Sequence, residues 1–326
     1  MIEVSLHAPL PDALRGSVVA IGNFDGVHRG HQALLERARA MARQESRAFG
    51  VVTFEPHPRS FFRPDQPVFR LSPQALKLRL LKALGADFVS VITFDVALAA
   101  LAAEDFVRRE LLEKLDVRHV VTGYDFHFGK DRKGNADTLR AMGLEVSCLE
   151  EVTDEGAGHL AFSSSNIRHA LRQGRLAQAS HELGYDWTIL GTVVPGDQRG
   201  RTIGFPTANI VVEPGVEPAR GIFATQVREV GTQSPIWMGA GYFGDRPTFN
   251  TNRTFLEVYL LDQTLDLYGK QLLVSFVELI RPDQSFPSVE ALISQMKNDC
   301  DVARRILTSR MVADFPLAQM QAAGLI

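Results

Sequence analysis

The chain contains little cysteine and no long hydrophobic run, and both absences exclude whole classes of protein. Only two of its 326 residues are cysteines, Cys148 and Cys300, and no Cys-x-x-Cys occurs. Neither a disulfide framework nor a cysteine-based zinc site is indicated, so we expect both to be small packing residues. No apolar stretch is long enough to span a bilayer, and the N-terminus lacks the features of a signal peptide. We therefore expect a cytoplasmic protein without a membrane partner.

The chain also lacks an excess of either charge. Lys and Arg number 35 and Asp and Glu number 38, which gives a formal net charge of -3, and no long basic run occurs. Broad binding to nucleic acid or to a membrane surface therefore has no electrostatic support. The length suits two domains, and nothing in the sequence sets an oligomeric state.

The first half alternates short apolar runs with amphipathic stretches. Strands separated by helices predict a parallel sheet covered on both faces, of the Rossmann-like α/β class. Ligands of such sheets bind at the carboxyl ends of the strands, where the loops 22–30 and 123–134 are expected to lie. The predicted strands are 17–21, 50–54, 88–94, 118–122 and 144–149, and the predicted helices are 31–43, 73–84 and 104–115.

The pattern changes after about Tyr185, where short apolar runs alternate with Gly- and Pro-rich turns. This pattern predicts an antiparallel sandwich or barrel, followed by a helix that Ser288 caps and that runs to about Leu307. We therefore place one domain at 1–185 and another at 186–326, joined through the helical stretch 167–185. The predicted strands are 188–194, 207–212, 221–227, 236–240, 254–261 and 271–280.

The first motif is Gly22–His31, with the sequence GNFDGVHRGH. Its glycines allow the backbone to pass close to a ligand, and His28 and His31 lie at the start of a predicted helix. Free backbone N–H groups and the positive end of the helix dipole gather there and suit a phosphate, to which two imidazoles add donors. The histidines are alternatively half of a metal site. Asp25 either holds the loop or lies near a metal.

The second motif is Gly200–Asn209, with the sequence GRTIGFPTAN. Pro206 fixes the backbone as the chain enters a strand, and Thr207 and Asn209 then lie on one face of that strand. Two neutral oxygens on one face are able to ligate Mg²⁺ together with ATP phosphates and waters. The motif is not a Walker A loop, and its alternative interpretation is a plain turn leading into a strand.

The two motifs resemble the two halves of bacterial bifunctional riboflavin kinase/FAD synthetases. The first half is similar to the FMN adenylyltransferase half, a nucleotidyltransferase with a His-x-Gly-His signature, and the second half to an antiparallel riboflavin kinase barrel with a C-terminal helix. The resemblance runs from about Val18 to Leu307. Further segments that carry it are 53–58, 123–129, 163–168, 221–224, 246–249, 256–262 and 266–270.

The resemblance implies that the first domain joins FMN and ATP to make FAD and pyrophosphate. The attacking phosphate oxygen of FMN is already anionic, so positioning and charge neutralisation matter more than a general base. His28 and His31 are implied to be catalytic, and Asp125, Phe126 and Phe128 to bind flavin. The residues implied to hold the ATP phosphates are Gly22, Phe24, Gly26, Gly30, Ser163, Ser164, Ser165 and Arg168.

The resemblance implies that the second domain phosphorylates riboflavin to FMN. Glu257 would be the base that accepts the proton of the neutral 5′-hydroxyl, and Thr207 and Asn209 would hold Mg²⁺. Arg281 is implied to lie near the flavin. The residues implied to lie at the ATP phosphates are Gly196, Gly200 and Arg201.

Four positions depart from the family pattern and bear on flavin affinity. Tyr259 stands where His is usual, Tyr242 where Asn is common, Gln263 where Phe is common and His127 where Arg is usual.

Three other functions compete with the two-reaction enzyme. The first alternative is an enzyme in which one site is active and the other is a relic. The second is a protein that senses flavin without turnover, and the third is a relative of the tRNA synthetases. A sensor needs neither a base at Glu257 nor a metal site at Thr207 and Asn209. The balanced charge and the absence of Lys-Met-Ser-Lys-Ser disfavour a synthetase.

Overall fold

The computed structural model describes residues 2–4, 10–154, 160–196, 200, 203–232, 234–245, 254–311 and 316–322. The chain forms two compact units. The first unit comprises Met1–Val68 and Leu76–Ser163, and the second comprises Phe69–Ala75 and Ser164–Ile326. Because each unit has its own core and its own sheet, each is described by itself.

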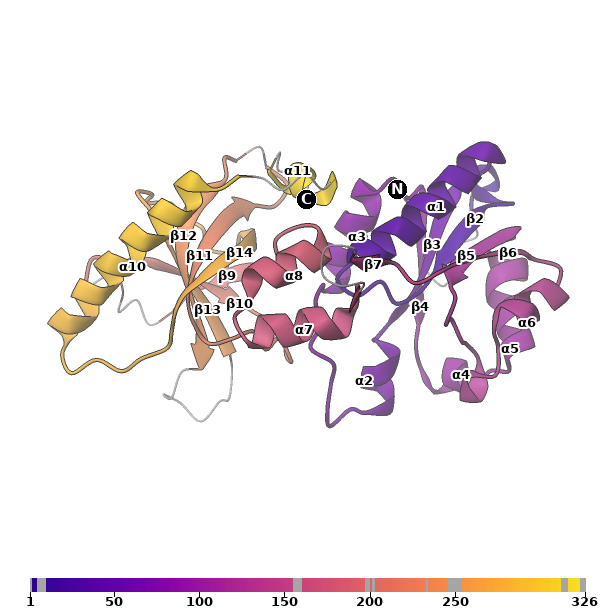
Figure 1. Cartoon of the computed structure of the whole chain (residues 1–326), viewed down its shortest axis with the longest axis horizontal. Helices are drawn as coiled ribbons and strands as arrows, with labels where there is room; N and C mark the ends of the chain where they lie inside the picture. Colours follow the sequence, from indigo (N-terminus) through magenta and orange to yellow (C-terminus); the bar gives the residue numbers. More distant parts are fainter. Residues whose placement is uncertain are drawn as a thin grey trace. The chain divides into compact units, whose positions relative to one another are not determined.

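A six-stranded parallel sheet forms the centre of the first unit (Figure 1). The strand order is β1-β4-β3-β2-β5-β6, and every adjacent pair is parallel, so the predicted parallel α/β sheet is confirmed. The five predicted strands all form, and β1 is an additional edge strand. The bounds are β1 Ile2–Val4, β2 Val18–Ile21, β3 Phe49–Glu55, β4 Phe88–Thr93, β5 His119–Gly123 and β6 Glu145–Leu149.

The helices of this unit bury apolar faces against the sheet. The α1 helix buries Leu34, Leu35 and Ala38, the residues whose spacing predicts it, and it contacts β2, β3 and β5. The predicted helix 104–115 begins as α5 and continues as the π-helix η2. The bounds are α1 Arg29–Gln44, α2 Pro58–Phe62, α3 Gln74–Ala83, α4 Val96–Ala99, α5 Ala103–Phe106, η2 Val107–Lys114 and α6 Ala136–Ala141.

The strand order places a topological switch point beside β2. The chain proceeds from β2 through β3 to β4 on one side, and then adds β5 and β6 on the other side. The loops that leave β2 and β5 at their carboxyl ends therefore diverge and leave a crevice between them, which is where α/β sheets bind ligands. Both loops that the sequence predicts as binding loops follow these two strands.

The second unit contains a closed six-stranded antiparallel barrel with strand order β10-β13-β12-β11-β14-β9. This closure decides between the two predicted architectures in favour of a barrel. Figure 1 shows α10 along the outside of the barrel, where it contacts β11, β12 and β14. The strands are β9 Thr188–Val194, β10 Thr207–Val211, β11 Gly221–Glu229, β12 Trp237–Asp245, β13 Thr254–Leu260 and β14 Gln271–Pro282.

Ser288 caps α10 as the sequence predicts. The helix comprises Val289–Ser309, and the Ser288 hydroxyl accepts a hydrogen bond from the amide of Ala291 at 3.2 Å. A short helix α11, Pro316–Ala322, follows it. The stretch predicted as one helical join forms two helices, α7 Ser164–Arg172 and α8 Leu176–Leu183, which pack on each other.

The segment Phe69–Ala75 belongs to the second unit although it comes early in the chain. The backbone oxygen of Phe69 accepts a 2.6 Å hydrogen bond from Nε of Arg168, and that of Leu71 accepts one from the indole of Trp187 at 3.0 Å. The α7 and α8 helices belong to this unit as well. The assignment of separate functions to 1–185 and 186–326 stays a prediction.

One expectation about cysteine is wrong. Cys300 is buried, and burial raises the pKa of its thiol to about 11, but Cys148 is exposed on the edge strand β6. An alternating edge strand places one face in solvent, so its small residues need not pack in the core. No helix among the described residues is long and apolar enough to cross a membrane.

Candidate functional sites

The Gly22–His31 motif forms the loop between β2 and α1, at the switch point of the sheet. The Gly22 amide donates to the backbone oxygen of Val52 at 3.1 Å, which ties the start of the loop to β3. His28 is the N-cap residue of α1 but makes no side-chain capping hydrogen bond. The loop thus leads into the N-terminus of a 16-residue helix, the kind of position at which anions bind, and phosphate binding there stays a prediction.

The two histidines of the motif are stacked. Their ring centroids are 3.7 Å apart, and the ring of Phe24 meets that of His31 edge-on at 5.2 Å. Nδ1 of His31 is buried and has no hydrogen-bond partner among the described residues. Burial, the neighbouring His28 and the charge of Lys77 all hold the pKa of His31 well below its ordinary value.

The loop is held in an unfavourable backbone conformation. Phe24 and Val27 have φ angles of +49° and +40°, and Gly26 has +79°. Positive φ is easy for glycine but costs a β-branched residue such as valine of the order of 1–3 kcal/mol. Strain of this kind persists only where the surrounding structure imposes it, and such strain clusters at ligand-binding sites.

The structure does not support a metal site at the two histidines. Within the described residues, the side chains close enough to form a three-ligand metal site are Glu45, His119 and Glu145. They lie at the opposite end of the strands from the histidines, where β5 and β6 begin. There His119 Nδ1 is 2.8 Å from Glu45 and Nε2 is 3.0 Å from Ser147, ordinary hydrogen-bond distances. This group ties the end of α1 to the sheet.

The segment Ser163–Arg168 is divided between the units. Ser163 ends the first unit, whereas Ser164, Ser165 and Arg168 belong to α7 in the second. Ser165 is exposed, but Arg168 is buried and uses its Nε on the carbonyl of Phe69. Whether these groups hold a phosphate stays a prediction.

The predicted flavin residues of the first unit lie in the loop after β5. Asp125 is exposed, and Phe126 and Phe128 stack with centroids 5.5 Å apart. Further rings extend this pair into a continuous aromatic row. The members beyond Phe126 and Phe128 are Phe106, Phe54, Phe94, Phe61 and Phe62, each 5.2–6.2 Å from the next.

The second site is built on the paired strands β10 and β13. Asn209 lies directly opposite Glu257, and Thr207 lies on the same face of β10 two residues earlier. The Thr207 hydroxyl donates to a Glu257 carboxylate oxygen at 3.3 Å. Gly196 allows the preceding loop to lie against this site, since a Cβ there would be 2.3 Å from the side-chain nitrogen Nδ2 of Asn209.

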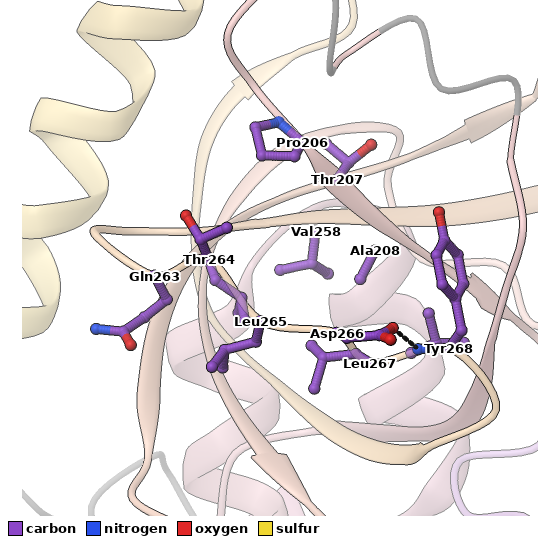
Figure 2. Close-up of a pocket in the computed structure, with 12 residues that line it drawn as sticks. Pro206, Thr207, Ala208, Val258, Gln263, Thr264, Leu265, Asp266, Leu267 and Tyr268 are labelled. Carbon is purple, nitrogen blue, oxygen red and sulfur yellow. Dashed lines mark hydrogen bonds between the residues drawn. The ribbon is translucent and has the colours of Figure 1, made fainter.

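Two cavities lie on opposite faces of these strands, and Thr207 contributes to both. The smaller, about 340 Å³, is lined by Glu257, Tyr242, Tyr259 and Phe205 among others. The larger, about 670 Å³, is lined by Ala208 and Val258 from the strands and by the segment 263–268 (Figure 2). The Tyr268 amide donates to Asp266 at 3.3 Å within that segment, as the dashed line in Figure 2 shows.

Arg281 lines the smaller cavity, but its charge is already paired. Its guanidinium makes a bidentate contact with buried Asp299, with Nε–Oδ1 and Nη2–Oδ2 distances of 3.0 and 2.8 Å. The Tyr242 hydroxyl donates to Asp283 at 3.1 Å, and burial raises the pKa of Tyr259. Gly200 lines the same cavity. Arg201 and the segment 246–249 lie outside the described residues.

Two features of the first unit escape the sequence reasoning. The aromatic row joins residues from five separate segments, β3, α2, the segment after β4, α5 and the loop after β5, and only the strand order brings them together. Lys77 lies on α3 and is 3% exposed, and its ammonium group reaches the hydroxyl of Thr53 near the end of β3. The sequence does carry a signal for its burial, because Lys77 interrupts the apolar face that Leu76, Leu80 and Leu81 form on α3.

Comparison with known proteins agrees with both halves of this architecture. Residues 10–166 match the family described as FAD synthetase, and residues 183–307 match the family described as riboflavin kinase. A nucleotide-binding α/β unit and a kinase barrel therefore occur in one chain, and both are enzyme families.

Relatives that span both units identify the family. A bifunctional riboflavin kinase/FMN adenylyltransferase of Escherichia coli (strain K12) is 39% identical over 89% of this chain and 92% of that protein. One from Pseudomonas fluorescens is 38% identical over 92% of this chain and 96% of that protein. The chain belongs to the family of bifunctional riboflavin kinase/FMN adenylyltransferases.

A solved structure shares the fold across both units. It is described as a macrolide-efflux protein from Streptococcus pneumoniae, with a TM-score of 0.81 and 31% sequence identity over 93% of this chain and 99% of that one.

The lowered pKa of His31 predicts a pH-dependent stability of the first unit. As pH falls through the ordinary histidine pKa of about 6.5, the unfolded chain takes up a proton that folded His31 does not, so the free energy of unfolding falls until the folded pKa is reached. His31→Asn removes this contribution, and the other histidines are common to both proteins. Amide hydrogen exchange in β2 and β3 measures the difference, and equal pH slopes for the two proteins would contradict it.

Proposed function

We propose that this chain phosphorylates riboflavin to FMN in the barrel and then adenylylates FMN to FAD at the β2–α1 loop, using ATP in both steps. The observation that carries the proposal is the position of Glu257 opposite Asn209 and within hydrogen-bond distance of Thr207, at the strand pair between two cavities. A proton acceptor and neutral metal ligands meet there, which flavin binding alone does not require.

In the kinase step, the 5′-hydroxyl oxygen of riboflavin bonds to the γ-phosphorus of ATP, and the bond from that phosphorus to the β-phosphate bridging oxygen breaks. The hydroxyl is neutral, so Glu257 takes its proton as the new bond forms. ADP leaves with the electron pair of the broken bond. Riboflavin is assigned to the smaller cavity, because Tyr242, Tyr259 and Phe205 offer ring surfaces beside Glu257.

ATP is assigned to the larger cavity, with its phosphates directed toward Thr207, the residue that lines both cavities. Gly200, which lines the smaller cavity, and Gly196 are assigned to these phosphates, and the family resemblance assigns Arg201 to them as well. ATP-using families of this kind generally need a divalent metal, and we assign it to Mg²⁺ at Thr207 and Asn209. The donors fit a hard cation, because all are oxygens and the Glu257 carboxylate lies beside them. When bound, the ion would neutralise phosphate charge.

In the adenylyltransfer step, a phosphate oxygen of FMN bonds to the α-phosphorus of ATP and pyrophosphate leaves. The nucleophile is anionic, so the site needs charge neutralisation and alignment rather than a base. The first amides of α1 and the imidazoles of His28 and His31 supply donors toward the transferring group. Ser163, Ser164, Ser165 and Arg168 are assigned to the phosphate tail.

The aromatic row is assigned to the flavin ring of FMN. Phe126 and Phe128 begin this row beside the switch point, and Phe62 ends it with 64% of its surface exposed. Phe54, Phe106 and Phe128 belong to the buried core, so the stacking surface for a planar ring comes from the partly exposed rings at the ends of the row, Phe126, Phe94, Phe61 and Phe62. We also propose a cytoplasmic location, since both steps consume ATP and the two cysteines are free. We propose no nucleic-acid partner, because the charges of the chain are nearly balanced.

The histidines should be required for the second reaction only. His28→Ala and His31→Ala should each lower FAD formation from FMN by about 10²-fold, the size expected for loss of a group that stabilises transition-state charge. Riboflavin phosphorylation by the same preparations should not change, and chromatographic separation of the flavins measures both rates. Equal loss of the two activities would assign the histidines to folding or to a shared site.

Glu257 should be required for the first reaction only. Glu257→Gln keeps size and hydrogen bonding but removes basicity, so FMN formation should fall by about 10²–10⁴-fold. FAD formation from supplied FMN should not change, which controls for folding. Normal phosphorylation by a folded Glu257→Gln protein would remove Glu257 from the mechanism.

A further inference from the structure

Lys77 is a charged residue in a core position of the first unit. It lies on the buried face of α3 beside Leu76, Leu80 and Leu81, and only 3% of its surface is exposed. Lysine is almost never fully buried unless its ammonium group is paired. The partners of this ammonium group therefore show what the charge does.

The Lys77 ammonium group joins the β2–α1 loop to the end of β3. Its Nζ lies 2.7 Å from a carboxylate oxygen of Glu55 and 3.2 Å from the hydroxyl of Thr53, both on β3. It also donates to the backbone oxygen of Asn23 at 3.2 Å, and the Thr53 hydroxyl donates to the same oxygen at 3.1 Å. Two donors thus converge on one carbonyl of the loop.

That carbonyl immediately precedes the strained part of the loop. Phe24, Gly26 and Val27, which all have positive φ, follow Asn23 directly and lead to His28. A strained conformation needs external contacts to persist, and Asn23 is where Lys77 supplies one. Displacement of the Asn23 carbonyl would move the histidines and the first amides of α1 together.

The charge of Lys77 also acts on the second histidine. Burial is the main cause of the lowered pKa of His31, and the charges of His28 and Lys77 lower it further. Glu55 pairs the lysine from β3. A positive charge on this side disfavours protonation of His31, so the imidazole stays neutral.

A stabilising ion pair alone does not account for this arrangement. Buried ion pairs can often be replaced by apolar residues without loss of stability. Here the third contact is to a loop carbonyl rather than to another charge, and it falls at the residue where the strain begins.

We infer that Lys77 is a positioning residue for adenylyl transfer, which fixes the β2–α1 loop through the Asn23 carbonyl. The inference rests on the function proposed for that loop. Lys77 does not touch the reacting atoms: its ammonium group faces β3 and the loop backbone, and it is closed off from solvent.

The test uses the full-length protein and three substitutions. Lys77→Met removes the charge and the hydrogen bonds, and Lys77→Met with Glu55→Gln also removes the carboxylate that would otherwise be left unpaired. Lys114→Met is the matched control, because Lys114 pairs with Glu110 at 3.1 Å in η2 of the same unit. FAD formation, riboflavin phosphorylation and the NMR titration of His31 are measured for each.

A positioning role predicts that kcat for FAD formation falls by about 10–100-fold in both Lys77→Met proteins, since small misplacements at a reacting centre have effects of this size. The KM for ATP in FAD formation should stay near wild type, and so should the rate of riboflavin phosphorylation. The pKa of His31 should rise. Lys114→Met should change none of these quantities.

A wild-type kcat together with an unchanged His31 titration in the double variant would overturn the inference. A rise in the KM for ATP alone would also overturn it, by making Lys77 a direct phosphate ligand.

If neither Met protein folds, Lys77→Arg decides, because a guanidinium keeps the charge but changes the contact geometry. Reduced kcat with a retained low His31 pKa then supports positioning, and a wild-type kcat rejects it. Failure of the wild-type protein itself to make FAD would instead reject the proposed function.

Discussion

The hydrogen-bond ladder that pairs β2 with β3 on one side and β5 on the other is the interaction on which the first site depends. All four residues of β2 are buried, and the burial of each large apolar side chain contributes about 1.5–3 kcal/mol. This pairing fixes where β2 ends, and so where the chain must turn into α1. The strained turn, the stacked histidines and the start of α1 all depend on that fixed point.

In the barrel, the register of two paired strands positions the site residues. The antiparallel pairing of β10 with β13 places Asn209 opposite Glu257, and a slip of one residue would turn Glu257 to the other face. Closure of the barrel removes free edges at which such a slip begins. One unit thus positions its site by the end of a strand, and the other by the alignment of two strands.

Much of this fold could be predicted from local patterns. Apolar runs predicted β3 and β9, helical spacing predicted α1, and Ser288 predicted the start of α10. Helical spacing does not predict the break between α7 and α8, which falls at Gly174, with a φ of +70°, shortly after α7 ends at Arg172. Alternation alone does not distinguish a closed barrel from a sandwich, because it specifies strands but not the pairing of the first with the last; the family resemblance is what implies the barrel.

The candidate sites were predictable where one segment carries them. The β2–α1 loop and the Thr207–Asn209 pair are short motifs, and the structure places each at a strand end or on a strand face as expected. The aromatic row and the contacts of Lys77 were not predictable, because they join segments separated by dozens of residues. A charge on an apolar helix face indicates that a buried partner exists, but not which one.

The most direct test of the two-reaction account follows the flavins made by the unaltered protein. Incubated with riboflavin, ATP and Mg²⁺, the chain should form FMN first and then convert it to FAD with release of pyrophosphate. Supplied FMN should yield FAD without a lag. Binding of riboflavin without formation of either product, or formation of FMN that is never converted to FAD, would contradict the account.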